Sequence, residues 1–185
     1  MATPNTSNRR PALTGAAAAL ALLLAGQIIR SFEPPSDPAR RGIAYADKLA
    51  RGIPTACDGH TGPDVKLGMV YSDAQCDAWS LQDRQAALAT VNRCLHPPKP
   101  LSGHNGGALV SAVYNDGSVI VCGSTLQRLV NSGAPAKIWC PELLKFNKYH
   151  TIKMVDGKPV KVYHVSTGLY RRRRTAELPT CLTED

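Results

Sequence analysis

The sequence predicts an α+β domain: a small β lobe followed by a larger helical lobe, with an apolar helix ahead of both. Three observations support this. Residues 40–70 carry five glycines between short apolar pieces, a pattern that suits a meander of hairpins. Later segments begin at or near serines suited to capping helices, and residues 151–165 alternate polar and apolar side chains about a turn. The 185 residues have room for one such domain and a short N-terminal element.

The helical lobe is marked by start and stop signals. Ser72 and Gln75 form a capping box, and the prolines after His96 end the helix that it opens. Ser102 is placed to cap a second helix, and a third ends at the Asn-Ser-Gly of residues 131–133. Helices are expected over residues 72–94, from 102 past 114, 124–131, 136–147 and 168–178, with a hairpin over 151–165 that turns at Asp156-Gly157.

The apolar N-terminal segment determines where we expect the protein to be found. Residues 11–29 hold no charge, between Arg9-Arg10 and Arg30, and nineteen helical residues span about 28 Å, roughly the hydrocarbon thickness of a bilayer. The preceding arginines favour a cytoplasmic N-terminus with the domain outside. Alanines and glycines dilute the leucines, so this helix would be only marginally stable in lipid. The alternatives are a cleaved signal peptide, although Leu23 stands where a cleavage site needs a small residue, and a permanent anchor.

The charge balance points to polyanionic partners. Lys and Arg number 22 against 14 Asp and Glu, a net charge of +8. Anionic lipid and the bacterial envelope fit this balance, whereas nucleic acid is disfavoured because aromatic residues are few and no recognition module is present. We interpret the densest block, residues 171–174, as a solvated helix face.

Six well-spaced cysteines stand behind this export segment, at positions 57, 76, 94, 122, 140 and 181. None forms a CxxC motif, which disfavours zinc. An even number in an exported chain predicts disulfides, with free buried thiols as the alternative. The cysteine spacing alone leaves the pairing open.

Several motifs follow one another along residues 40–182. The first is Ala44-Tyr45-x-Asp47, with Gly52-Ile53-Pro54-Thr55 and Gly59-His60-Thr61-Gly62 after it. The others are Tyr71-Ser72-x-x-Gln75-Cys76, Val91-Asn92-Arg93-Cys94, Ala108-Leu109-Val110-Ser111-x-x-Tyr114-Asn115-x-Gly117 with Cys122-Gly123-Ser124-Thr125-Leu126, and Gly168-Leu169 with Arg173-Arg174-x-Ala176-Glu177. In this order they resemble the phage lysozymes of glycoside hydrolase family 24. The apolar segment resembles the signal-anchor-release sequence of phage endolysins.

The resemblance implies a lysozyme-like fold and a catalytic Glu, Asp and Thr. Asp47 and Thr55 match by their neighbours, although seven residues separate them, more than in the family. The usual spacing would place the acid at Pro38, which cannot donate a proton. We therefore expect Glu33 to be the acid, because its apolar neighbours favour a protonated carboxyl and Ile28-Ile29-x-x-Phe32 resembles the helix that presents it. Asp37 as the acid and a degenerate site are the alternatives.

The family resemblance also assigns roles. Glu33 would protonate the leaving oxygen, Asp47 would activate the attacking water and Thr55 would position it. His60 resembles a structural histidine with a packing role, and Tyr114 and Asn115 would lie at the groove, Tyr114 mainly by packing. No cofactor and no metal are expected. By sequence order, the cysteines would pair as 57–76, 94–122 and 140–181.

The resulting hypothesis is a monomeric muramidase that causes host cell lysis. Residues 1–31 would be the signal-anchor-release segment and residues 32–185 the catalytic domain. Its partners would be the glycan strands of peptidoglycan and, through the N-terminal segment, the inner membrane; no nucleic acid is expected. The enzyme would be held inactive on the periplasmic face until release into the periplasm, since tethering draws Glu33 away from Asp47. A lytic transglycosylase and a non-catalytic peptidoglycan-binding protein are the alternatives.

Overall fold

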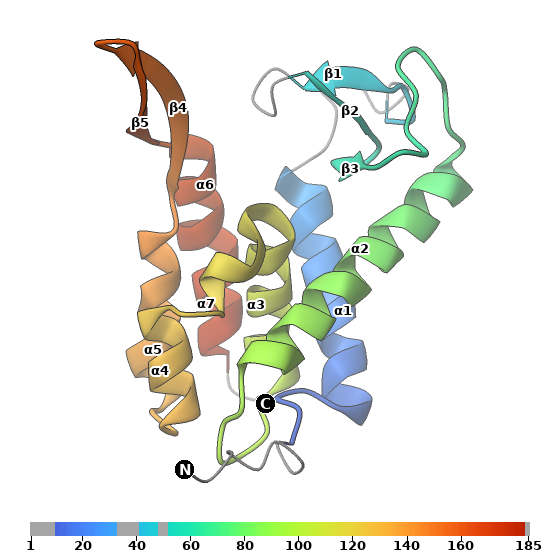
Figure 1. The fold of residues 1–185 in the computed structure, drawn as a ribbon. Coiled ribbons are helices and arrows are strands. Elements are labelled where there is room, and N and C mark those ends of the chain that lie inside the picture. The colour runs from blue at the N-terminus through green and yellow to red at the C-terminus, as the bar shows by residue number, and fades with distance from the viewer. Residues whose placement is uncertain (1–9, 33–40, 48–51, 184–185) are drawn as a thin grey trace, which may run out of the picture.

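The computed structural model describes residues 10–32, 41–47 and 52–183. A small three-stranded sheet lies at one end of a bundle of helices, and a long two-stranded hairpin rises from the same end (Figure 1). The predicted α+β organisation is confirmed. The helices and strands are α1 (Gly15–Phe32), β1 (Tyr45–Asp47), β2 (Ile53–Ala56), β3 (His60–Thr61), α2 (Asp73–Cys94), α3 (Gly103–Asp116), η2 (Gly117–Ile120), α4 (Thr125–Asn131), α5 (Ala136–Trp139), η3 (Cys140–Lys145), β4 (Lys148–Val155), β5 (Lys158–Val165), α6 (Thr167–Arg172), η4 (Arg173–Glu177) and α7 (Leu178–Leu182).

The predicted helix starts are confirmed by their caps. Ser72, Ser102 and Ser124 each accept a hydrogen bond from the backbone N–H three residues later, so each satisfies a donor that the helix itself leaves unpaired. At α3 the box is reciprocal, because the side chain of Asn105 also accepts from the backbone N–H of Ser102. The hairpin predicted about Asp156-Gly157 is also present, as β4 and β5.

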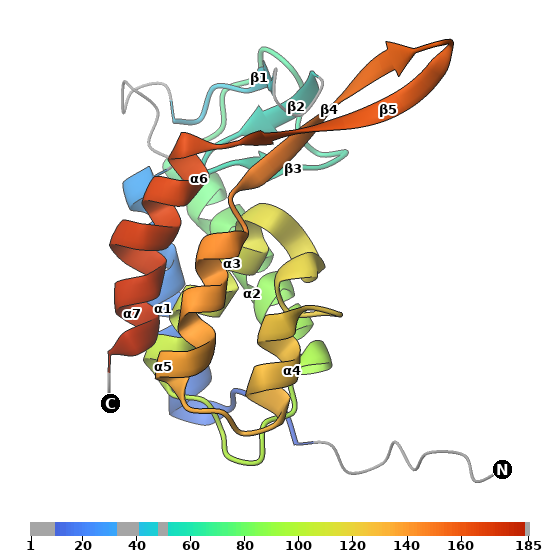
Figure 2. The same cartoon turned by 90° about the vertical axis from the view of Figure 1, so that its left-hand side faces the viewer.

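Two predicted helices are less regular than expected. The helix expected over residues 136–147 has one α-helical turn, α5, and then continues as the 3₁₀-helix η3. Pro141 is the reason, because it cannot donate to the α-helical ladder. The last helix contains the π-helical turn η4 between α6 and α7, which run continuously in Figure 2.

The apolar segment forms α1, which lies along α3 and α2 as part of the helical lobe (Figure 1). Glycines of α3 make the close approach possible. A Cβ added at Gly106 would lie 2.8 Å from Ala21 of α1 and 2.6 Å from Leu13, which precedes α1, and one added at Gly103 would lie 2.6 Å from Leu20. By length and composition alone, α1 is also long and apolar enough to cross a membrane.

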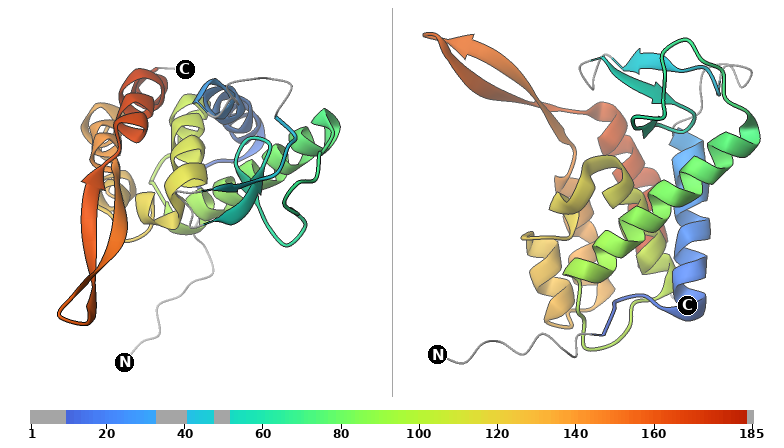
Figure 3. Two further views of the ribbon diagram at one scale, coloured as in Figure 1. Left: turned by 90° about the horizontal axis from the view of Figure 1, so that it is seen from above. Right: turned by 45° about the vertical axis from the view of Figure 1, so that its right-hand side comes forward.

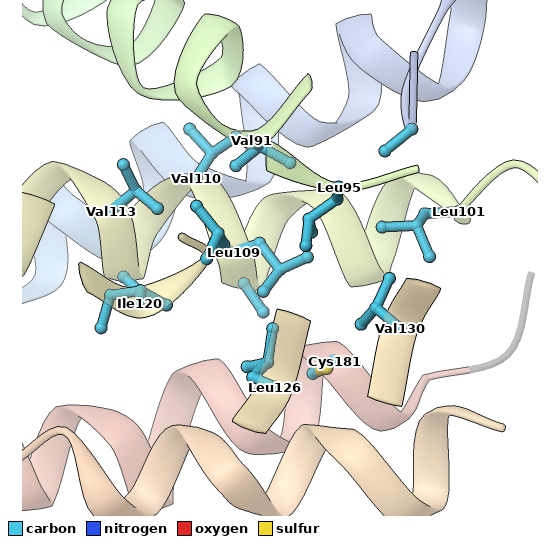
Figure 4. Packing of buried hydrophobic residues seen from close by; sticks show 14 of the residues in the cluster. Val91, Leu95, Leu101, Leu109, Val110, Val113, Ile120, Leu126, Val130 and Cys181 are labelled. Atoms are coloured by element: carbon cyan, nitrogen blue, oxygen red, sulfur yellow. The ribbon is translucent and has the colours of Figure 1, made fainter. Parts of the chain in front are cut away.

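The main core lies where α1, α2 and α3 meet the C-terminal helices. Leu109 and Val110 of α3 are fully buried at its centre, and Figure 4 shows Val91, Leu95, Ile120 and Leu126 around them. A smaller core of Trp79 and its neighbours supports the β lobe, joined to α2 by the disulfide Cys57–Cys76. The other two disulfides are Cys94–Cys122 and Cys140–Cys181, so the pairing implied by the family resemblance is confirmed.

The prediction that residues 171–174 form a solvated face is wrong for its two central arginines. Arg172 is 2% exposed and Arg173 is fully buried. Both pair with the buried carboxylate of Glu177, which neutralises part of their charge and accepts from one donor of each. Only the outer members of the run, Arg171 and Arg174, are exposed.

Candidate active site

A cleft of about 580 Å³ lies between the β lobe, the end of α3 and the base of the β4–β5 hairpin. Figure 3 shows the β lobe and the hairpin rising separately from the helical body. The side chains expected to do chemistry, Asp47 and Thr55, are among those that line it. The lining residues are Tyr45, Asp47, Thr55, Asp58, Gly59, Thr61, Tyr114, Asn115, Asp116, Tyr149, His150, Val165, Ser166, Thr167 and Leu169.

The register of the β sheet brings Asp47 and Thr55 to one face. Tyr45 pairs with Thr55, and Asp47 pairs with Ile53. Opposed residues of antiparallel strands share a face, as do alternate residues of one strand. Asp47 and Thr55 are therefore diagonal neighbours. Thr55 is 2% exposed and donates from Oγ1 to the carbonyl of Ile53 at 3.1 Å, whereas Asp47 is half-buried.

The proposed acid, Glu33, lies outside the described residues, as do Asp37 and Pro38. The helix that precedes Glu33 ends at Phe32, and the Arg172 guanidinium lies 5.9 Å from the centre of the Phe32 ring. Arg172 also donates to Oδ1 of Asn115 at 2.9 Å, and Asn115 lines the cleft. A single buried arginine thus links the C-terminal end of α1 to the cleft wall.

A buried ionic network lies beneath this wall. Ser111 donates to Oε1 of Glu177 at 2.7 Å, and Arg173 donates to Oδ2 of Asp116 at 2.7 Å. Burial raises the pKa of Asp116, while the charge of Arg173 opposes this shift. Sequence reasoning missed the network, although the spacing of Arg173 and Glu177, four residues apart on a helix, was a usable signal.

His60 has the packing role expected for it. It is buried, its ring stacks on Trp79 with centroids 4.4 Å apart, and its Nδ1 lies 2.8 Å from Oδ2 of Asp83. Tyr114 combines two roles, because its hydroxyl donates to the carbonyl of Asp58 at 2.7 Å while it lines the cleft. Both contacts hold the β lobe against the helices.

Charged contacts attach the β lobe to α1 and α2. Arg41 donates to Oδ2 of Asp58 and Oδ1 of Asp77, each at 2.8 Å, and Arg30 of α1 also pairs with Asp77. The hydrogen bond from Arg41 lowers the pKa of Asp77. This cluster fixes the end of α1 close to the strands that carry Asp47 and Thr55.

The arrangement suits hydrolysis of a glycosidic bond. Such a reaction needs a carboxylic acid on one side of the bond and, opposite it, a carboxylate that activates water. Of the described carboxylates in the cleft, Asp58 is paired with Arg41 and Asp116 with Arg173, which suits structural roles. Asp47 is the cleft carboxylate that shares a face of the sheet with Thr55.

Comparisons with known proteins agree on one family. The phage lysozyme profile matches residues 39–177. The SAR-endolysin of Enterobacteria phage P21 is 34% identical over 131 residues, covering 67% of this chain and 73% of that protein.

Solved structures point the same way. The endolysin from Escherichia coli O157:H7 phage FAHEc1 superposes with a TM-score of 0.66 at 30% identity, over 86% of this chain and 90% of that one. The muramidase domain of SpmX from Asticaccaulis excentricus superposes with a TM-score of 0.65 at 26% identity, over 86% of this chain and 95% of that one.

Proposed function

This chain belongs to the phage lysozyme family and is a glycoside hydrolase that cuts peptidoglycan, and we propose that Glu33, Asp47 and Thr55 carry out the cleavage. Its reaction is hydrolysis of the β-1,4 bond between N-acetylmuramic acid and N-acetylglucosamine, which lyses the host cell. The observation that carries the residue assignment is the shared face of Asp47 and Thr55 on the wall of the cleft.

In the proposed mechanism, the carboxyl of Glu33 gives its proton to the leaving glycosidic oxygen. Asp47 takes a proton from the attacking water, and the Thr55 hydroxyl orients that water. The assignment of Glu33 is supported by its position directly after α1. The last residue of α1, Phe32, lies against Arg172, which donates a hydrogen bond to the cleft residue Asn115.

The direct test compares three substitutions in a turbidity assay on permeabilised Gram-negative cells. Glu33→Gln and Asp47→Asn should each lower the rate by about 10²–10⁴-fold, because each removes a proton-transfer group. Asp37→Asn is the control and should stay close to the wild type. If Asp37→Asn abolishes lysis while Glu33→Gln retains it, Asp37 is the acid.

Product analysis separates hydrolysis from the competing transglycosylase reaction. Hydrolysis leaves a reducing sugar, and mass spectrometry should detect that product. An anhydro sugar would contradict the hydrolytic mechanism. Binding of sacculi with no product of either kind would instead indicate a degenerate, non-catalytic site.

We infer that residues 1–31 first hold the protein in the inner membrane, facing the periplasm, and later leave the bilayer. Support comes from the length and apolar composition of α1 and from relatives that are SAR-endolysins. Docking of α1 on α3 brings Phe32 to Arg172, which binds the cleft residue Asn115, whereas a spanning α1 would draw Glu33 away. A displacement of about 1 Å can cost roughly 100-fold in rate.

Replacing the segment by an all-leucine anchor tests this control by release. The anchored protein should accumulate in the membrane without lysing cells, whereas the native chain lyses them. Equal lysis by both would exclude regulation by release, and a shortened N-terminus in mass spectrometry would indicate cleavage instead. We further propose that the catalytic domain comprises residues 32–185. The released enzyme acts as a monomer and does not bind nucleic acid.

A further inference from the structure

The β4–β5 hairpin projects well beyond the helical body, as Figures 2 and 3 show. Its eight-residue strands pair from Lys148 and Val165 at the base to Val155 and Lys158 beside the turn. Almost all of its side chains are exposed, including those of Tyr163 and Met154. A two-stranded ribbon that packs on nothing else is only marginally stable in water. Contact with a ligand would stabilise it, which suits a role in binding.

The register divides the hairpin into two faces. At the base of the hairpin the cleft is lined by His150 and Val165 of one face and by Tyr149 of the other; we call the face with His150 and Val165 the cleft-side face. The opposite face is the outer face. The cleft-side face holds Lys148, His150, Ile152, Met154, Pro159, Lys161, Tyr163 and Val165, and the outer face holds Tyr149, Thr151, Lys153, Val155, Lys158, Val160, Val162 and His164.

The two faces differ in how their aromatic groups are engaged. On the outer face His164 stacks on Tyr149, with centroids 5.1 Å apart, and its Nε2 lies 2.9 Å from the Thr151 hydroxyl. On the cleft-side face Tyr163 is 65% exposed, and its ring is tilted against the paired His150 at 5.9 Å. On the cleft-side face the ring of Tyr163 is therefore accessible to a ligand.

Charge complements this aromatic ring. Lys148 and Lys161 are exposed on the cleft-side face, Lys153 and Lys158 are exposed on the outer face, and the one acidic residue of the hairpin, Asp156, lies in its turn. Peptidoglycan offers both matching groups, because its sugar rings present apolar C–H faces to aromatic rings and its peptide stems end in carboxylates.

We propose that the cleft-side face of the hairpin is a second binding surface for peptidoglycan, continuous with the catalytic cleft. Tyr163 and His150 contact a sugar ring beyond the cleaved bond, and Lys148 and Lys161 pair with stem carboxylates. This rests on the proposed function, because it extends the cleft that Asp47 lines. Continuity with the cleft favours peptidoglycan over an anionic lipid surface, which would engage the tip rather than the base of the ribbon.

The test measures binding to purified sacculi by co-sedimentation, in an Asp47→Asn background that prevents hydrolysis. Lys161→Ala with Tyr163→Ala should raise the dissociation constant about tenfold, as expected for loss of an aromatic anchor and a charge. The matched control removes the paired outer-face residues, through Lys153→Ala with Val160→Ala, and should bind like the parent. Added salt should weaken binding of the parent more than binding of Lys161→Ala.

Two outcomes would overturn the proposal. One is equal binding by the cleft-side and outer-face variants. The other is a cleft-side variant that no longer binds phosphatidylglycerol vesicles but binds sacculi as the parent does, which would indicate that the hairpin binds lipid. Circular dichroism confirms that each variant is folded. Hydrolysis of sacculi by the protein with Asp47 intact is measured separately. If that protein does not hydrolyse sacculi, the proposed function fails. The comparison of binding by the cleft-side and outer-face variants does not depend on that result.

Discussion

Arg84 of α2 donates a hydrogen bond from Nη1 to the backbone carbonyl of Leu22 in α1, at 2.6 Å. Gly26 leaves the space that the guanidinium occupies, since any Cβ there would collide with it. Burial lowers the pKa of Arg84. A charged side chain of α2 thus binds the backbone of a largely apolar stretch of α1.

The close contact between α1 and α3 predicts that adding a single methyl group to a glycine of α3 lowers the stability of the fold. Gly106→Ala should lower the free energy of unfolding by about 1–3 kcal/mol, because the new methyl group would lie 2.6 Å from Leu13 and 2.8 Å from Ala21. Thermal unfolding measures this. Gly168→Ala is the matched control, since its Cβ would meet no atom closer than 3.9 Å; equal destabilisation of both would show that packing against α1 is not responsible.

The Arg41–Asp77 pair predicts part of the acid sensitivity of the fold. The hydrogen bond from Arg41 holds the pKa of Asp77 below its ordinary value of 3.8, so the pair contributes stability above about pH 4 and loses it as the pH falls through the folded pKa. Asp77→Asn should therefore be less stable than the wild type at neutral pH, with a difference that shrinks below about pH 4. Denaturant unfolding across this range measures it.

Asp73→Asn is the control for that experiment. Its carboxylate lies 3.4 Å from the same arginine but is 84% exposed, so solvent screens the interaction. A pH-dependent loss of the same size in both variants would contradict a specific role for Asp77.

The disulfide Cys140–Cys181 ties α7 to the 3₁₀-helix η3 and spans 41 residues. Replacing both cysteines by alanine should lower the free energy of unfolding by about 3–4 kcal/mol, because an open chain regains conformational entropy when it unfolds. Guanidinium denaturation measures the change. The same replacement at Cys57 and Cys76, which span 19 residues, should cost less; the reverse order would show that loop length does not govern the effect.

Local signals were sufficient to predict much of the fold. Helix caps and tight turns depend on residues only a few positions apart, so a short stretch of sequence is enough to predict them. This holds for the caps at Ser72, Ser102 and Ser124 and for the turn at Asp156-Gly157. Asp47 and Thr55 were predicted from the family resemblance; the short sheet register brings them to one face, and their catalytic roles stay predictions. Glu33 stays a prediction, because it lies outside the described residues.

Long-range partners explain what the sequence did not reveal. The run at residues 171–174 was predicted to be solvated although Glu177 stands nearby, because its other acidic partner, Asp116, lies 57 positions from Arg173. The contact of α1 with α3 was likewise hidden, since Gly103 and Gly106 acquire meaning only once Leu13 and Leu20 lie against them. The cleft-side face of the hairpin depends on a cleft built from segments more than 100 residues apart.

The small residues of α1 have a further consequence. Ala21, Ala25 and Gly26 are buried against the neighbouring helices, and a Cβ added at Gly26 would collide with Arg84. Exchanging them for leucine would increase the affinity of the segment for hydrocarbon and, by the same added atoms, prevent its insertion among the other helices. A few added carbon atoms at these three positions should therefore shift the segment from packing against the protein toward retention in a bilayer.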